Sequence, residues 1–147
     1  MKLCDLTLSR TISASPEAIF DVWLDPKSPG GPWFDAVRVI FQPDVPSVDG
    51  LFYHSVAYEG HSWAHHGRFV ELDRPRVVSY TWLSAATQGV ESLVTVRLEP
   101  SGDPSDGRTV VTLVHKNLPD DELGRQHEDG WDWILSALAD RFDAPAT

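Results

Sequence analysis

Apolar and polar residues alternate in short stretches over most of the chain before residue 117. In the first stretch, Leu6, Leu8 and Ile12 alternate with polar residues, which is the pattern of a strand with one buried face. Further strands are expected on the same grounds over residues 37–41, 51–58, 62–71, 77–83, 91–99 and 109–116. The links between them are short and rich in turn-forming residues, so neighbouring strands should be antiparallel.

Two segments have the spacing of amphipathic helices. The first begins at Ser15-Pro16, with Ser15 as N-cap, and is short because Asp25-Pro26 ends it. The second is predicted as one long helix over residues 118–142, with an apolar stripe of Leu123, His127, Trp131, Ile134, Leu135, Leu138 and Phe142. Because such a stripe must pack on something, we predict an α+β fold: a curved antiparallel sheet of about six to seven strands wrapped around the C-terminal helix.

Composition and charge narrow the function classes. The 147 residues are 41% hydrophobic and 23% charged, as expected for a single globular domain over residues 1–147. A net charge of −10 without a Lys/Arg cluster excludes the basic footprint of a nucleic-acid binder and disfavours an anionic membrane surface. Cys4 is the only cysteine, and neither a signal peptide nor a membrane span is predicted, so we expect a cytoplasmic protein. A homodimer is compatible with the sequence.

Several short motifs resemble those of one family in both order and spacing. They are Thr11–Trp23, Asp25-Pro26, Gly67–Pro75, Ser92–Val96, Thr109–His115 with Leu118-Pro119, and His127–Trp131. The chain is similar to the AHSA-type family of the START-like (SRPBCC) superfamily, related to the C-terminal domain of a heat-shock chaperone ATPase activator. The resemblance implies a helix-grip fold with a cavity between sheet and helix. Residues 30–34, Gly-Gly-Pro-Trp-Phe, depart from the family pattern because the Pro precedes the aromatic residues, at the expected pocket mouth.

The aromatic residues, which include 6 Trp and 6 Phe, have two readings. Most aromatic side chains in a small domain form its core. The implied cavity suggests instead that some contact a ligand, and the candidates are Trp23, Trp33, Phe34, Tyr53, Trp63, Tyr80, Trp82, His115, His127 and Trp131. Our first hypothesis is therefore a small-molecule-binding protein whose partner is a hydrophobic lipid-like, polyketide or aromatic ligand.

Two other functions stay open. An enzyme of cyclase, dehydratase or hydrolase type would use the same cavity, with His115 or His127 as an acid–base group. The alternative for these two residues, which the usual behaviour of buried histidines favours, is a hydrogen-bonded structural pair that holds the helix to the sheet. The sequence holds no nucleophile-elbow, phosphate-loop or dinucleotide motif, so we assign no catalytic residue and expect no cofactor. The third function is a protein-interaction domain, as in the chaperone-activator relatives.

No metal site is expected. His61, His65 and His66 are close in the sequence, but His65 and His66 are neighbours on a predicted strand and so point to opposite faces. No Cys or acidic residue completes a set of converging ligands. Glu128 and Asp132 are expected on the solvated side of the final helix rather than as a catalytic pair.

Overall fold

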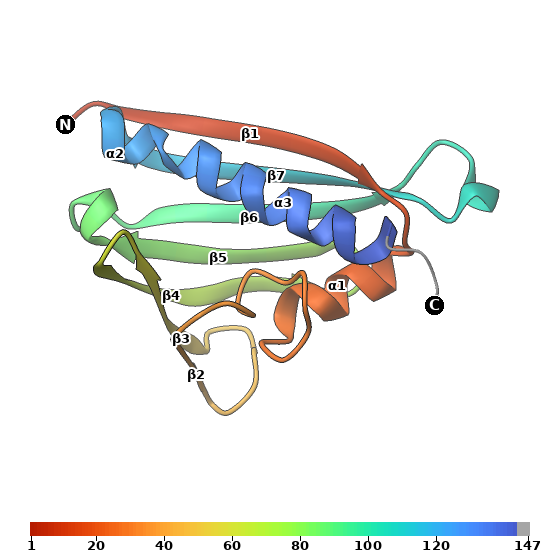
Figure 1. The fold of residues 1–147 in the computed structure, drawn as a ribbon, viewed down its shortest axis with the longest axis horizontal. Helices are drawn as coiled ribbons and strands as arrows, with labels where there is room; N and C mark the ends of the chain where they lie inside the picture. Colours follow the sequence, from red (N-terminus) through yellow and green to blue (C-terminus); the bar gives the residue numbers. More distant parts are fainter. Residues whose placement is uncertain (144–147) are drawn as a thin grey trace.

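A single antiparallel sheet forms the frame of the protein, which we describe from a computed structural model for residues 1–143. Its strands lie in the order β1-β7-β6-β5-β4-β3-β2 (Figure 1). The strands are β1 (Leu3–Ile12), β2 (Arg38–Gln42), β3 (Leu51–Tyr58), β4 (His61–Asp73), β5 (Val77–Ser84), β6 (Ser92–Pro100) and β7 (Thr109–Pro119). The predicted strands and their antiparallel pairing are confirmed.

Within residues 1–143, five helical segments connect or cover the strands. They are α1 (Pro16–Leu24), the 3-10 helices η1 (Ala85–Thr87) and η2 (Pro104–Asp106), α2 (Glu122–Arg125) and α3 (His127–Asp143). The start of α1 follows the prediction: the Ser15 hydroxyl accepts a hydrogen bond from the Ala18 backbone N–H at 3.2 Å, and Pro16 occupies the first turn. Asp25 caps its end.

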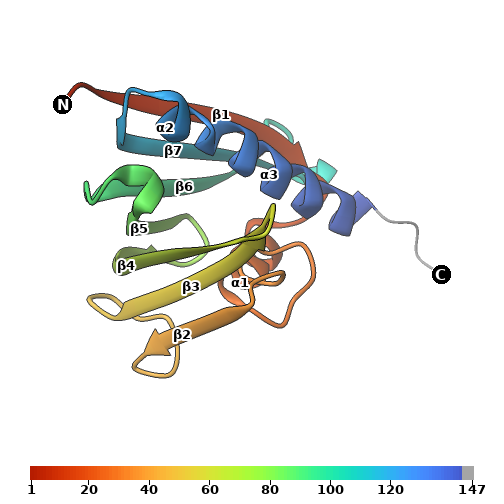
Figure 2. The same cartoon turned by 60° about the vertical axis from the view of Figure 1, so that its left-hand side comes forward.

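The sheet curves around α3, which lies across its inner face beside β1 (Figures 1 and 2). Trp131, Leu135 and Leu138 of α3 are buried against the inner-face side chains of the strands. A hydrogen bond of 2.7 Å from Arg10 Nη1 on β1 to Ser136 Oγ fastens the helix at the sheet edge. The predicted fold class, a sheet wrapped around a C-terminal helix, is therefore confirmed.

The C-terminal helix begins later than the sequence pattern suggested. Leu118 and Pro119 extend β7, because they pair with Cys4 and Leu3 of β1. A turn follows, in which the Asp121 carboxylate accepts from the Gly124 backbone N–H at 2.8 Å and so starts α2. The predicted single helix is thus two, and its first apolar position, Leu123, is 41% exposed instead of buried.

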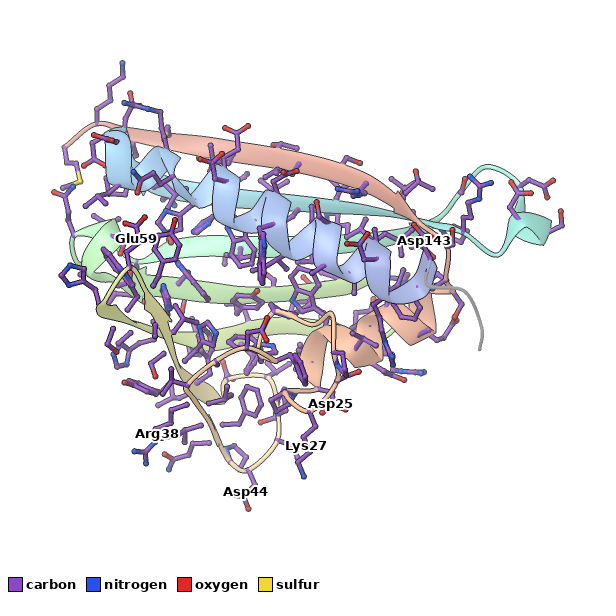
Figure 3. The ribbon with its side chains drawn as sticks, in the orientation of Figure 1. Asp25, Lys27, Arg38, Asp44, Glu59 and Asp143 are labelled. Atoms are coloured by element: carbon purple, nitrogen blue, oxygen red, sulfur yellow. The ribbon has the colours of Figure 1, made fainter. Side chains whose placement is uncertain are left out.

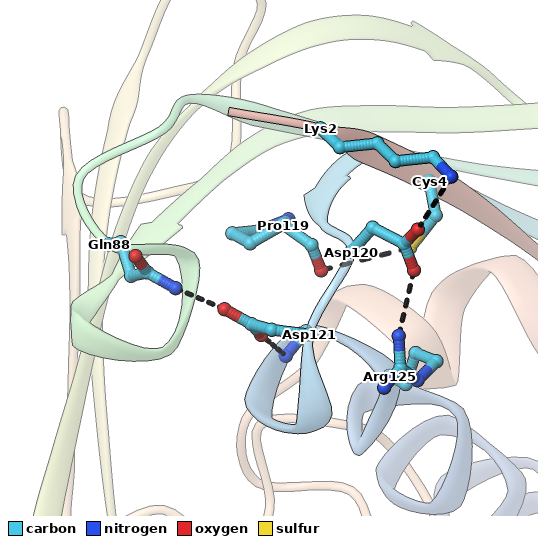
Figure 4. A network of polar contacts seen from close by, with 8 residues as sticks. Lys2, Cys4, Gln88, Pro119, Asp120, Asp121 and Arg125 are labelled. Carbon is cyan, nitrogen blue, oxygen red and sulfur yellow. Dashed lines mark hydrogen bonds and ion pairs between the residues drawn. The ribbon is translucent and has the colours of Figure 1, made fainter.

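Polar contacts hold this turn against the neighbouring elements (Figure 4). Asp120 forms ion pairs with Lys2 at 3.6 Å and with Arg125 at 2.8 Å. The Gln88 side-chain amide, just after η1, donates to the Asp121 carboxylate. These contacts fix where α3 enters the concave side of the sheet. Within residues 1–143, no helix combines the length and apolar character needed to cross a bilayer.

Candidate functional site

The cavity expected between α3 and the sheet is not open, because that space is filled by aromatic and imidazole rings, which we call the ring cluster. Its members come from α1, the loop of residues 25–37, four strands and α3, and all are buried. They are Trp23, Trp33, Phe52, His54, His65, Phe69, Tyr80, Trp82, His115 and Trp131. Strand register explains why they meet, since the opposed pairs His54–His65 and Phe69–Tyr80 all point to the inner face.

Trp33 occupies one half of the ring cluster although it belongs to a loop. It is only 1% exposed, and its ring lies 5.1 Å from Phe52, 5.0 Å from His54 and 5.8 Å from Tyr80 between centroids. Gly30 allows the loop to come this close: its φ is +89°, and a Cβ there would lie 2.7 Å from Cβ of Arg141 on α3. The loop therefore places the Trp33 side chain inside the space between the sheet and α3.

Trp82 and Trp131 occupy the other half. Their ring centroids are 5.4 Å apart, and Trp131 also stacks on Trp23 of α1 at 6.4 Å. Trp82 stacks on His65 with the centroids 4.3 Å apart. These contacts connect α1, α3 and the inner face of the sheet through π-surfaces alone.

His115 on β7 has both ring nitrogens occupied. Trp131 Nε1–H donates to Nδ1 at 2.9 Å, so Nδ1 is unprotonated and the proton of the neutral ring lies on Nε2. Nε2–H then donates to Ser92 Oγ at 2.8 Å, and the Ser92 hydroxyl donates to the Trp82 backbone carbonyl at 2.5 Å. The ring is fully satisfied by the protein. His127 lies edge-on to it at 5.1 Å and donates from Nδ1 to the Gly124 carbonyl at 3.0 Å.

Burial keeps the imidazoles of the ring cluster neutral. It lowers the pKa of His54 to about 4, of His65 to about 3 and of His115 to about 2. Burial also lowers the pKa of His127, although the Gly124 carbonyl opposes the shift. His54 and His65 share one proton between Nδ1 atoms 3.3 Å apart, so one ring donates and the other accepts. The pKa of the Tyr80 hydroxyl is raised by burial.

Several polar atoms in the ring cluster have no hydrogen-bond partner among the described residues. They are Nε1 of Trp23, Trp33 and Trp82, Nε2 of His54 and the Tyr80 hydroxyl oxygen. The Trp23 indole lies close enough to lower the pKa of Tyr80 slightly against the effect of burial, but not in hydrogen-bond geometry. The site thus combines an apolar lining with unused hydrogen-bonding capacity.

The sequence-predicted site residues divide into three groups. Trp23, Trp33, Tyr80, Trp82, His115 and Trp131 meet in the ring cluster, and His127 borders it. Trp63 is half-buried on the same face of β4 as His65. Phe34 and Tyr53 lie elsewhere: Phe34 is 43% exposed, and Tyr53 is on the outer face against His66, with ring centroids 5.1 Å apart.

Sequence reasoning left Phe52, His54, His65 and Phe69 out of the candidate site. The signal that could have found them is strand alternation, because Phe52 and His54 share one face of β3 and His65 and Phe69 share one face of β4. Both faces of β3 carry an aromatic residue, so the pattern alone did not identify the inner one. Among residues 1–143, no group of three or more His, Cys, Asp or Glu side chains converges to hold a metal ion.

A curved antiparallel sheet around a C-terminal helix is the helix-grip fold. Residues 13–143 match the family described as "Activator of Hsp90 ATPase homolog 1-like protein", and the chain belongs to that family. A search of curated proteins found no match.

Solved structures of the same fold have low sequence identity to this chain. Protein MLL2253 from Mesorhizobium loti is 17% identical with a TM-score of 0.75, covering 98% of this chain and 100% of that one. Protein CV1439 from Chromobacterium violaceum is 20% identical with a TM-score of 0.73, covering 96% and 98%. Ara h 8.0201 is 10% identical with a TM-score of 0.70, covering 94% and 96%. At these identities the likeness shows the fold alone.

Proposed function

We propose that this domain binds an uncharged, largely apolar small molecule bearing hydrogen-bond acceptors, in the space now filled by the ring cluster. The observation that carries the proposal is the set of five buried polar atoms that make no hydrogen bond of good geometry within residues 1–143. Buried polar groups are nearly always hydrogen-bonded, and each one left alone costs about 1–3 kcal/mol. Five in one cluster are better explained by partners from outside the chain than by core packing.

The five atoms also describe the ligand. Three are indole N–H groups, which can only donate, and the Tyr80 hydroxyl can donate as well. A molecule that satisfies them needs acceptor oxygens, such as those of ketones, esters or ethers. The ring cluster contains no Lys, Arg, Asp or Glu, and its imidazoles are neutral near pH 7, so a charged group on the ligand would be buried unpaired.

Entry requires a ring to move, because the rings are in mutual contact. Trp33 is the ring best placed to move, because it belongs to a loop and not to a strand or helix. Backbone hydrogen bonds within residues 25–36 are local, as in the 3.3 Å bond from the Gly31 N–H to the Ser28 carbonyl, and the loop also places the Pro32 carbonyl beside the His54 imidazole. The loop can therefore swing outward without breaking a strand pair, and withdrawal of the Trp33 indole opens a space lined by Phe52, His54 and Tyr80.

A matched pair of tricyclic probes tests the proposal: 9-fluorenone, which carries a ketone, and fluorene, which has no oxygen. Calorimetric titration should show fluorenone binding about tenfold more tightly, as one added hydrogen bond provides. Trp33→Ala should strengthen the binding of both probes because it removes the ring that must move. Tyr80→Phe should narrow the difference between the probes while leaving fluorene binding unchanged.

The control is Val37→Ala, an exposed residue at the end of the same loop, which should bind both probes as the wild type does. Equal affinities for fluorenone and fluorene would mean that ordered water already satisfies the donors, and would reject the acceptor requirement. If neither probe binds to the wild type or to Trp33→Ala, the ring cluster is an ordinary core and the proposal fails.

A further inference from the structure

The sheet has an open edge at β2, whose outer-face side chains point away from the ring cluster. β2 is the last strand in the sheet order and pairs with β3 on one side only, so within residues 1–143 its other side has no strand partner. Unpaired backbone N–H and C=O groups along such an edge are a template for another strand. The opposite edge, β1, lies beside α3 and bonds to it through Arg10.

The side chains around this edge are apolar in the middle. Ile40, at the centre of β2, is 43% exposed on the outer face of the sheet. Its cross-strand partner is Tyr53, and the next outer-face position of β3 is Leu51, opposite Gln42. Ile40, Leu51 and Tyr53, the edge patch, line a shallow groove with His66. An apolar patch that reaches a free strand edge is typical of an interaction surface.

Opposite charges lie at the two ends of the edge. Arg38 begins β2, and Asp44 follows its last residue by two positions. Figure 3 shows both side chains pointing away from the body of the protein. Neither forms an ion pair with any of the residues described here. The edge thus has a positive end, an apolar centre and a negative end. A second copy of the same edge, rotated by 180°, therefore matches it in charge and in apolar contact.

We infer that β2 pairs antiparallel with β2 of a second copy of this chain, about a two-fold axis at Ile40. Ile40 then faces its own equivalent, and Arg38 faces Gln42 of the partner subunit. Asp44 of the partner subunit comes within reach of the long Arg38 side chain, and the symmetry makes this charge pair twice. Self-complementarity of this kind is what a two-fold interface requires. The two sheets join into one, and the edge patches become continuous across the axis.

Light scattering on size-exclusion chromatography, from micromolar to millimolar protein, tests the pairing. The wild type should dimerise. Ile40→Lys places two like charges at the axis and should raise the dimer dissociation constant by about tenfold or more. Trp133→Lys is the matched control, because Trp133 is 61% exposed on α3, away from β2, and its substitution should not change the dissociation constant.

A charge exchange separates specific pairing from general disturbance. Arg38→Asp alone and Asp44→Arg alone should each weaken the dimer, and the two together should restore it. Circular dichroism and urea unfolding establish that each variant is folded. A monomeric wild type, a dimer insensitive to Ile40→Lys, or a double variant that fails to recover would each overturn the inference. None of these outcomes depends on ligand binding, which uses the inner face.

Discussion

Trp131 Nε1–H donates a 2.9 Å hydrogen bond to His115 Nδ1, and this buried bond joins the second turn of α3 to β7. It also fixes the tautomer of His115, whose Nε2–H donates to Ser92. In this arrangement His115 cannot accept the Ser92 proton, so the two residues are not a nucleophile and its base. The pair clamps the helix to the sheet, which leaves the hydrolase hypothesis without a nucleophile at this position.

Loss of the hydrogen bond between Trp131 and His115 should lower the free energy of unfolding. His115→Ala leaves the Trp131 indole without its acceptor and opens a gap in a fully buried site, so we expect the free energy of unfolding to fall by about 3 kcal/mol. His127→Ala, which removes a half-buried ring with one bond to the Gly124 carbonyl, should cost about 1 kcal/mol. Urea unfolding measures both. Equal losses would contradict the central role of His115.

Tyr80→Phe, unlike the two histidine variants, should not lower the free energy of unfolding. The buried Tyr80 hydroxyl makes no hydrogen bond of good geometry within residues 1–143, so its removal relieves an unsatisfied polar group and should leave the stability unchanged or raise it by up to about 1 kcal/mol. Ser79→Ala, one position earlier on β5, is the comparison, because the Ser79 hydroxyl donates to the Val94 carbonyl at 3.1 Å and its loss should cost about 1 kcal/mol. Thermal unfolding of the free protein tests the contrast, and a marked loss in Tyr80→Phe would show that the hydroxyl is already satisfied.

Stability should decline in mild acid. The pKa values of His54, His65 and His115 are about 4, 3 and 2 in the folded chain, below the value near 6.5 of an unfolded histidine. Between these values the unfolded chain binds more protons, so the contribution of these rings is complete above about pH 6.5 and falls as the pH drops toward 4. Each histidine contributes a slope of about 1.4 kcal/mol per pH unit in that window.

The measurement for this pH dependence is urea unfolding from pH 8 to pH 5, with proton uptake on unfolding determined by calorimetry in buffers of different ionisation enthalpy. Uptake should rise as the pH falls through about 6.5. Stability that stays flat between pH 7 and pH 5 would mean that the imidazoles are solvated in the folded protein.

Gly67 on β4 should tolerate no side chain. A Cβ at this position would collide with the Thr81 carbonyl and the Phe52 ring, both parts of the packed sheet. Because the Thr81 carbonyl belongs to the backbone of β5 and cannot turn away as a side chain can, Gly67→Ala should lower the free energy of unfolding by about 3 kcal/mol. Gly102→Ala is the control, since nothing lies within 4 Å of its Cβ position and its stability should change little. Similar stability of the two variants would contradict the close packing behind Phe52.

Much of the fold could be predicted from the sequence because the strands and α1 carry local signals. Alternation in residues 51–58 and the Ser15-Pro16 start of α1 depend only on nearby residues, and both match the structure. The predicted start of the last helix does not match the structure. Leu118 and Pro119 pair with β1, whose residues are more than a hundred positions away in the sequence. Local apolar spacing contains no information about such a partner.

Part of the candidate site could also be predicted from local alternation along the strands. Aromatic residues at alternate positions, such as Tyr80 and Trp82, were expected to share a face, and both lie on the inner face, in the ring cluster. Tyr53 was a candidate by residue type, but its neighbour Phe52 faces the interior. Which of two adjacent aromatic residues faces inward depends on strand register and sheet curvature, and these are set by the whole sheet.

The pairing of β1 with β7 also determines when this protein can fold during its synthesis. Leu3 pairs with Pro119, so the first strand has no neighbour until residues 109–119 have left the ribosome, and α3 emerges later still. Until then β1 and the inner faces of β3 to β6 present apolar side chains to the cell. Sheets closed by such distant pairings form slowly, and their unpaired strands are prone to aggregate. The net charge of −10 provides repulsion between incomplete chains during that interval.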